Sequence, residues 1–201
     1  DPVTIAYFGY GSLVNLATLR TPYISAHPAR LRGWRRTWLS RPRDVDGFAP
    51  VDGLAFLSVM PDASCEIDGV VIVDHAASLS DLDQRESLYE RKIVEHRDCA
   101  FQSDNPLAPE TGLFLYEAMP TASFAMTPRI LRSYLDAVCQ GFLTHFGEQG
   151  LIDFKASTDN FHFPIREDRA DPIYPRPVKL SVNEKTAIDA HFPVSLTASA
   201  S

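Results

Sequence analysis

The chain has 201 residues, of which 45% are hydrophobic and 22% charged, a composition typical of a globular protein with one sizeable core. Its formal net charge of −7 argues against a nucleic-acid-binding surface, because such surfaces are usually basic. No apolar run approaches the roughly 18 residues that a membrane-spanning helix needs, and the first residues lack the basic and apolar regions of a signal peptide. We therefore expect no nucleic-acid partner and no membrane partner.

The metal-binding and thiol residues are few and scattered. Cys65, Cys99 and Cys139 are odd in number and far apart, which predicts free thiols that fill small apolar spaces in a reducing, cytoplasmic compartment. The six histidines never occur at ligand spacing with each other or with a cysteine. We therefore expect no metal site.

Apolar and β-branched alternation predicts about six strands, at residues 3–8, 30–39, 53–60, 68–73, 91–99 and 112–118. Turn signals separate most of them, among them Pro61-Asp62. Because the strands do not alternate regularly with helices, we predict a single α+β domain over residues 1–201. Its sheet is expected to be mixed and barrel-like, with flanking helices.

Four helices are expected around this sheet. A short one covers residues 13–20, and Ser80 caps a second over residues 81–88. The long third helix begins at Thr127-Pro128 and ends at Gly147 or Gly150.

The C-terminal part of the chain carries one further helix signal. Ser181 with Glu184 predicts a capping box and a short last helix. Residues 159–180 contain four prolines, which predicts an extended arm that wraps the body, and residues 195–201 are expected to be a frayed tail.

A basic and aromatic stretch stands out in this acidic chain. Residues 30–43 hold six arginines, two tryptophans and no acidic residue. Arginine beside aromatic rings suits nucleic-acid stacking, but the net charge favours arginines on the solvent face of a strand, with Trp34 and Trp38 in the core. A further alternative is that one arginine binds a substrate carboxylate through its planar guanidinium.

A glycine-rich turn follows the first predicted strand, with the sequence Phe8-Gly9-Tyr10-Gly11-Ser12-Leu13. Glycine permits positive φ and close approach of the backbone to a ligand. Consecutive amides in such a turn can hold a carboxylate or carbonyl oxygen. The turn lacks the closing glycine of a nucleophile elbow and the third glycine of a dinucleotide-binding motif, so Ser12 is not expected to be a nucleophile.

Taken together with Leu82-Asp83-Gln84-Arg85-Glu86, this turn resembles the γ-glutamylcyclotransferase-like superfamily, including its ChaC-like branch. Asp68-Gly69-Val70-Val71 ahead of the acidic helix, Tyr89 after it and Ser133-Tyr134-Leu135 in the long helix extend the resemblance. It covers roughly residues 5–145. Ser87 stands where the family often has glycine, which leaves glutathione specificity open.

The resemblance implies a mixed barrel fold with a pocket between the glycine turn and Glu86. In the implied reaction, the α-amine of a γ-glutamyl amide or peptide attacks its own γ-carbonyl, giving 5-oxoproline and a released amine, without cofactor or metal. Glu86 is the implied general acid and base. The implied substrate-binding residues are Tyr10, Gly11, Ser12 and Leu13 of the turn, with Tyr89 and Tyr134 as positioning hydroxyls. Asp83 and Arg85 are expected to serve in capping and surface pairing.

Two other functions stay open from the sequence. One is a binding or regulatory module that keeps the fold and the pocket without turnover. The other is a protein–protein scaffold in which the proline-rich arm reaches a neighbouring subunit, as in a homodimer.

Overall fold

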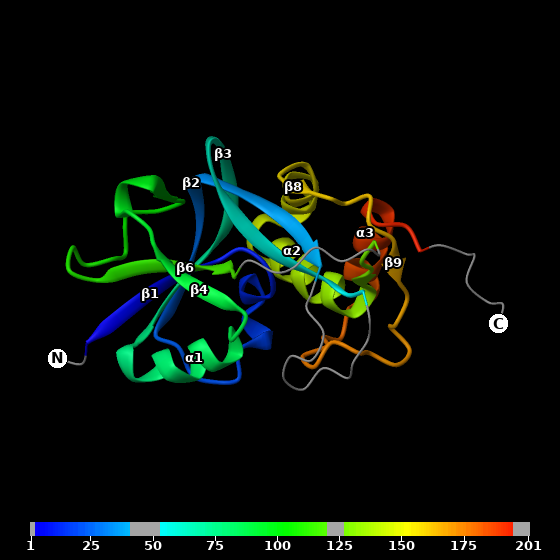
Figure 1. The fold of residues 1–201 in the computed structure, drawn as a ribbon, viewed down its shortest axis with the longest axis horizontal. Helices are drawn as coiled ribbons and strands as arrows, with labels where there is room; N and C mark the ends of the chain where they lie inside the picture. Colours follow the sequence, from blue (N-terminus) through cyan, green and yellow to red (C-terminus); the bar gives the residue numbers. More distant parts are fainter. Residues whose placement is uncertain (1–2, 41–52, 120–126, 195–201) are drawn as a thin grey trace.

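The structure is a computed structural model that describes residues 3–40, 53–119 and 127–194. At its centre lies a mixed sheet flanked by α-helices (Figure 1). The predicted tail at 195–201 lies outside the described residues. In the part of the chain that the structure describes, no helix is both long and apolar enough to cross a membrane. The strands of the central sheet are β1 (Thr4–Gly9), β2 (Ser25–Ser40), β3 (Ala55–His75), β4 (Tyr89–Ile93), β5 (Cys99–Phe101), β6 (Gly112–Ala118) and β8 (Thr158–Asp159).

The sheet is open rather than barrel-like, which corrects that part of the prediction. Its strand order is β4-β6-β1-β3-β2-β5, with β8 joined to β2. Strands β1 and β6 run parallel, as do β2 and β8, whereas β3 runs antiparallel to both β1 and β2. The prediction of a mixed sheet within an α+β fold is confirmed.

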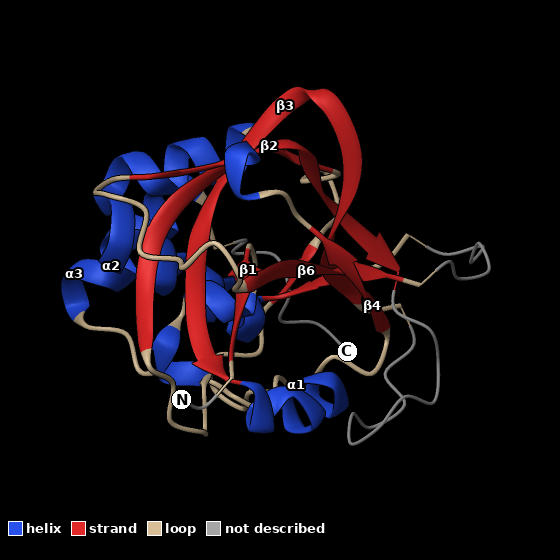
Figure 2. Ribbon diagram, turned by 90° about the vertical axis from the view of Figure 1, so that its left-hand side faces the viewer, coloured by secondary structure: helices blue, strands red, loops and turns tan. Residues whose placement is uncertain are grey.

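Strand β3 is one continuous element where the sequence predicts two strands separated by a turn. Pro61 lies within it and faces Trp34 of β2, next to a register shift between Arg32 and Trp34. The intervening Gly33 has φ of 87°, as expected of a bulge. A proline is tolerated at such an irregularity because the regular hydrogen-bond ladder is already interrupted there. Figure 2 shows β2 and β3 curving together across the molecule.

The single strand predicted at residues 91–99 is also wrong, because the structure divides it into two. It divides into β4, a 3-10 turn at His96–Asp98 and β5. Strand β4 pairs with β6, whereas β5 pairs with β2 at the other end of the strand order. The turn is needed because the chain crosses from one edge of the sheet to the other.

The first two predicted helices differ in detail from the structure. Residues 13–20 form two 3-10 turns, Ser12–Val14 and Leu16–Thr18. Helix α1 covers Leu79–Arg85, and Ser78 rather than Ser80 precedes it, without a side-chain cap. The helix therefore ends before Glu86.

The long helix α2 (Arg132–Ala156) begins later than Thr127-Pro128 predicts. Residues Ile130–Leu131 form the short strand β7, which pairs with β9 (Ile165–Arg166). Gly147 has φ of 66° and interrupts α2, as predicted, but the helical conformation then continues to Ala156. The predicted last helix is confirmed as α3 (Val182–His191), whose N-terminus has the complete capping box.

One main hydrophobic core lies between the sheet and α2. Trp38 is fully buried in it and Trp34 packs partly buried against it, as predicted. Cys99 and Cys139 are buried free thiols, whereas Cys65 is partly exposed. Helices α2 and α3 lie together, apart from α1 (Figure 1).

Candidate active site

The glycine turn begins where β1 ends at Gly9. Neither Gly9 nor Gly11 has a positive φ, so that part of the predicted reason for the glycines is wrong, whereas the close approach of a ligand stays a prediction. Close packing is the reason at Gly9, because a Cβ there would lie 2.8 Å from the Cβ of Leu13. The chain folds back on itself at this point and enters the 3-10 turn Ser12–Val14.

Helix α2 fixes this turn from one side. A Cβ on Gly141 would lie 2.7 Å from the backbone nitrogen of Asn15, so the helix approaches the turn as closely as a glycine permits. The Asn15 side chain donates to the carbonyl of Ala137, one helical turn earlier, at 2.8 Å. The turn is therefore locked against α2 by packing and by a buried hydrogen bond.

Arg36 fixes the same turn from the sheet. Its side chain is fully buried, and its Nε donates to the carbonyl of Tyr10 at 2.8 Å. Nη2 donates to the carbonyl of Asp68 at 2.7 Å. Its guanidinium lies 5.1 Å from the ring centre of Phe142 and 5.1 Å from that of Phe154. Burial lowers the pKa of Arg36 to about 9.

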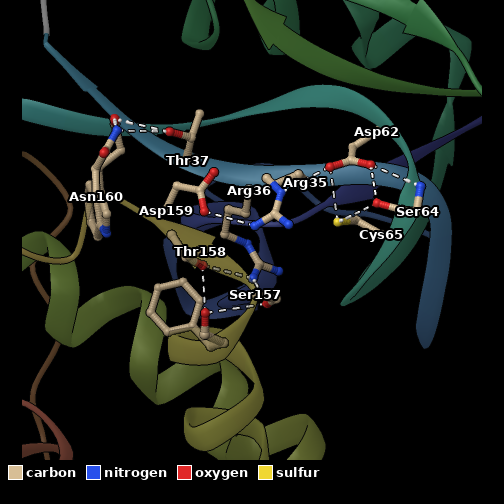
Figure 3. A network of polar contacts seen from close by, with 12 residues as sticks. Arg35, Arg36, Thr37, Asp62, Ser64, Cys65, Ser157, Thr158, Asp159 and Asn160 are labelled. Carbon is tan, nitrogen blue, oxygen red and sulfur yellow. Dashed lines mark hydrogen bonds and ion pairs between the residues drawn. The ribbon is translucent and has the colours of Figure 1, made fainter.

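The rest of the arginine-rich strand behaves differently from Arg36. Figure 3 shows Arg36 pointing to Ser157 and Thr158 while Arg35 turns to Asp62 and Asp159. Arg30 and Arg32 lie at the surface, as predicted, and form exposed ion pairs. Among the arginines that the structure describes, Arg36 is the exception to the predicted solvent face, because its side chain is buried against the glycine turn. Arg41 and Arg43 lie outside the described residues.

The first amides of the 3-10 turn are available to a ligand. Those of Ser12 and Leu13 donate no hydrogen bond to any other residue that the structure describes. The first N–H groups of a helical turn have no partner within it. That they hold a substrate oxygen remains a prediction.

Glu86 lies in the turn that joins α1 to β4 rather than on a helix face. Its N–H donates to the carbonyl of Leu82 at 3.0 Å, and its carbonyl accepts from the N–H of Tyr89 at 2.9 Å. The side chain is only 13% exposed. Two backbone hydrogen bonds thus hold a nearly buried carboxylate at the end of a helix.

Arg85 joins Glu86 to the glycine turn, so its predicted role in surface pairing is wrong. It donates from Nη1 to the carbonyl of Thr18 and from Nη2 to the Thr18 hydroxyl, each at 2.9 Å. Its Nε lies 3.3 Å from Oε1 of Glu86. Nη2 also lies 3.5 Å from Oγ of Ser12. The two turns are therefore bridged by one nearly buried guanidinium.

The electrostatics of this region suit a proton-accepting carboxylate. Burial raises the pKa of the Glu86 carboxyl above its ordinary value, and the guanidiniums of Arg85 and Arg176 oppose this shift. Burial also raises the pKa of Tyr10 and Tyr134, with a further contribution from the Glu86 carboxylate. The tyrosine hydroxyls thus stay protonated beside the carboxylate at neutral pH.

Two of the predicted tyrosines are fixed by hydrogen bonds. The Tyr89 hydroxyl donates to the carbonyl of Leu57 at 2.7 Å, and the Tyr10 hydroxyl donates to the carbonyl of Tyr116. The Tyr116 hydroxyl donates in turn to Asp83 at 2.7 Å. Asp83 thus accepts a tyrosine hydrogen bond from the sheet and also forms the predicted surface pairing, with Arg91 at 3.3 Å.

A cavity of about 270 Å³ opens beside these groups, with Ser12, Glu86, Tyr89 and Tyr134 in its wall. The same four residues line an adjoining recess of about 30 Å³ at the glycine turn. The other predicted site residues line only this recess, namely Tyr10, Gly11 and Leu13. The structure therefore brings all seven predicted residues together, and their individual roles remain predictions.

The outer wall of the cavity comes from the proline-rich arm, which the sequence predicts as an extended segment and not as part of the site. Tyr174, Pro175 and Arg176 lie there. The ring of Tyr174 packs edge-on against Tyr134, with 5.1 Å between ring centres. The available sequence signal was an arginine between two prolines, Pro175 and Pro177, in a segment with little regular structure.

The arm is anchored to helix α2 by buried polar contacts. Asp168 accepts from the N–H of Ser133 at 2.7 Å and from the N–H of Ile173 at 2.9 Å, so a residue of the arm caps the start of α2. Next to it, Arg169 bridges Asp136 of α2 and Asp189 of α3, at 2.7 Å to each. These contacts hold the arm in place on both helices.

The chemistry that the described residues offer is that of a carboxylate with tyrosine and guanidinium neighbours. The charged residues lining the cavity are Arg85, Glu86 and Arg176. Within residues 3–40, 53–119 and 127–194, no group of three or more His, Cys, Asp or Glu side chains is placed to hold a metal ion.

Several solved structures resemble this fold. A γ-glutamyl cyclotransferase aligns over 93% of this chain and 99% of its own, with a TM-score of 0.56 and 19% identity. An uncharacterized protein from Homo sapiens aligns over 92% of this chain and 98% of its own, with a TM-score of 0.50 and 19% identity. YkqA from Bacillus subtilis aligns over 78% of this chain and 56% of its own, with a TM-score of 0.54 and 16% identity.

No protein-family model matches the sequence, and no curated protein matches it. At identities of 16–19% the structural likeness carries the fold and not the activity. The chain has the γ-glutamyl cyclotransferase-like fold, as the sequence resemblance implied.

Proposed function

We propose that this protein is a γ-glutamylcyclotransferase that converts a γ-glutamyl amide or peptide into 5-oxoproline and a released amine. One observation carries the proposal: a nearly buried carboxylate, Glu86, lines the same recess as a glycine turn whose Ser12 and Leu13 amides have no hydrogen-bond acceptor among the described residues. The fold shared with a γ-glutamyl cyclotransferase supports it. The free cysteines agree with a reducing, cytoplasmic setting.

In the proposed reaction the enzyme mainly holds the substrate in a reactive conformation. Ring closure is intramolecular, so positioning supplies much of the rate. The neutral α-amine attacks the γ-carbonyl carbon, and the carbonyl oxygen becomes an oxyanion held by the amides of Ser12 and Leu13. Glu86 takes a proton from the attacking nitrogen and delivers it to the leaving nitrogen as the C–N bond breaks. No water is consumed.

The local electrostatics support Glu86 in this role. A carboxylate whose pKa is raised by burial is a stronger proton acceptor than an exposed one, and it keeps the proton until the leaving nitrogen takes it. The bridge from Arg85 keeps Glu86 directed across the cavity and holds the glycine turn opposite it.

The test is release of 5-oxoproline from γ-glutamyl substrates by the purified protein. We expect Glu86→Gln to lower kcat by about a thousandfold or more, since the acid and base functions are both lost, with the fold retained by circular dichroism and melting temperature. Glu90→Gln is the matched control, because Glu90 is exposed and paired with Lys92 at 2.9 Å. Full activity in Glu86→Gln would contradict the role of Glu86.

A non-catalytic binding module is the second candidate, and one observation favours it. The Arg85 guanidinium lies 3.3 Å from Glu86 and opposes the rise in its pKa, which weakens it as a base. For such a module, 5-oxoproline or glutamate raises the melting temperature while no γ-glutamyl compound is turned over. Turnover of any γ-glutamyl compound excludes it.

A further inference from the structure

The cavity has more positive than negative charge in its described lining. Arg85 and Arg176 face it against the single carboxylate of Glu86. This excess stands out in a chain whose net charge is −7. A cavity with an excess of cationic groups favours an anionic ligand.

The two guanidiniums are not equivalent. Arg85 uses its donors on Thr18 and on Glu86. Arg176 has no carboxylate within ion-pair distance among the residues that the structure describes. Burial and the nearby Arg85 lower the pKa of Arg176, while Tyr174 and Glu86 act in the other direction. A half-buried cation without a counter-ion is stabilised when an anion binds next to it.

The backbone around Arg176 is held before any ligand arrives. The N–H of Tyr174 donates to the Ser133 hydroxyl at 3.3 Å. The carbonyl of Pro175 accepts from Nη2 of Arg20 at 3.1 Å. Prolines on both sides of Arg176 restrict the chain further. A preorganised cation loses little conformational freedom on binding, which favours affinity.

The position of Arg176 relative to Glu86 indicates which part of a substrate it meets. The recess at the glycine turn and the larger cavity share Glu86, and Arg176 lines only the larger one. We place the reacting γ-carbonyl at the recess, beside Glu86. A recess of about 30 Å³ holds little more of the substrate, so its other parts, including the departing amine and its substituents, extend into the larger cavity. Arg176 lies in that direction.

We propose, on the basis of the proposed function, that Arg176 binds a carboxylate on the leaving part of the substrate. The planar guanidinium offers two parallel donors to a carboxylate. The protein then acts on γ-glutamyl amino acids or peptides in preference to γ-glutamylamines, which lack that carboxylate.

The experiment compares γ-glutamylalanine with γ-glutamylethylamide, which differ only by the carboxylate on the leaving group. We expect the wild-type kcat/KM to be roughly tenfold to a hundredfold higher for γ-glutamylalanine, the value of a charge-assisted hydrogen-bonded pair. Arg176→Ala should lower kcat/KM for γ-glutamylalanine far more than for γ-glutamylethylamide and so remove this preference. Both are measured above the acidic limb of kcat/KM, because Arg176 also acts on the pKa of Glu86. Arg176→Lys should restore part of the preference, because lysine keeps the positive charge but lacks the two parallel donors of the guanidinium.

Lys179→Ala is the control, since it removes one charge from an exposed position of the same arm that does not line the cavity. Equal loss on both substrates in Arg176→Ala would overturn the proposal, as would a wild-type protein without preference. If neither substrate is turned over, the proposed function fails. Calorimetric binding of the two compounds to wild type and Arg176→Ala then decides the carboxylate site on its own, and equal affinities would overturn it.

Discussion

Two regions meet at the cavity, and they are held in different ways. The glycine turn is fixed to the sheet and to α2, through the pairing of β1, the close approach of Gly141 and the buried side chain of Arg36, and Glu86 is held by two backbone hydrogen bonds. The arm segment with Arg176 is fixed by side chains, mainly Asp168 and Arg169. Groups on a sheet are placed more rigidly than groups on an arm.

This difference assigns the two regions different tasks. Bond-making groups lose rate steeply when displaced by an ångström, which suits the sheet-anchored turns. A charged group that selects a substrate tolerates more movement. Loosening the turn should therefore lower kcat on every substrate, and loosening the arm should raise KM on carboxylate-bearing substrates.

The largest effect is expected from loosening the turn. Arg36→Met keeps the length of the side chain and removes its donors to the carbonyls of Tyr10 and Asp68. We expect kcat to fall roughly tenfold to a hundredfold for both γ-glutamylalanine and γ-glutamylethylamide, because the turn amides shift. Stability should change less than activity, since the variant also removes the cost of burying a charge.

Steady-state kinetics beside a thermal melt measure this contrast. Arg30→Met serves as control, because Arg30 is half exposed on the same strand. A selective loss on one substrate only would contradict the assignment of Arg36 to the turn.

The second effect tests the arm. Asp168→Ala leaves the buried N–H of Ser133 and the N–H of Ile173 without their acceptor, which costs about 2–4 kcal/mol of stability. We expect KM for γ-glutamylalanine to rise about tenfold, with kcat within about twofold of wild type. Asp171→Ala, at an exposed position of the arm, should change neither value. A fall in kcat on both substrates would mean that the arm also positions the chemistry.

The third effect concerns pH. Arg85 lowers the pKa of Glu86 against the rise caused by burial. Its removal in Arg85→Gln should raise that pKa further, so the acidic limb of kcat/KM moves to higher pH, because the base must be ionised to act. Arg91→Gln, which removes a cation that pairs with Asp83, should leave the limb in place. If the acidic limb stays in place or moves to lower pH in Arg85→Gln, the group that titrates in the kcat/KM profile is not Glu86.

The smallest effect is expected at the edge of the arm. Arg20→Ala removes one exposed hydrogen bond to the carbonyl of Pro175. Such a bond contributes about 0.5–1 kcal/mol, so KM for γ-glutamylalanine should rise less than about threefold. A larger rise would show that Arg20, more than Asp168, holds Arg176 in place.

The local signals in the sequence predicted the elements that depend on local chemistry. The strand before Gly9, the capping box at Ser181 and the burial of Trp38 follow from short-range pattern and polarity. The Pro61-Asp62 signal was wrong because a long partner strand and a bulge at Gly33 override a local turn preference. The start of α2 was wrong because its cap, Asp168, lies far along the chain.

In the candidate site, too, the residues found from the sequence lie in local motifs, and the residues that were missed depend on long-range packing. Glu86, Ser12 and the tyrosines were identified because they lie in the motifs that resemble the γ-glutamylcyclotransferase-like superfamily. Arg36 and Arg85 were read as surface residues, since a sequence does not reveal that a charged side chain lies under a turn. Arg176 depends on long-range docking of the arm, which no local pattern encodes.

Along strand β3, the two sides of the cavity should differ in the rate at which their backbone amides exchange with solvent. Residues Val70–Val73 of this strand are paired with both β1 and β2, whereas Phe56, which lines the cavity, is paired with β2 alone. Backbone amides exchange with solvent by local opening, most slowly where both edges of a strand are bonded. Hydrogen exchange should therefore be slow beside the glycine turn and faster near Phe56, so that the wall facing the leaving group can adapt while the turn stays fixed.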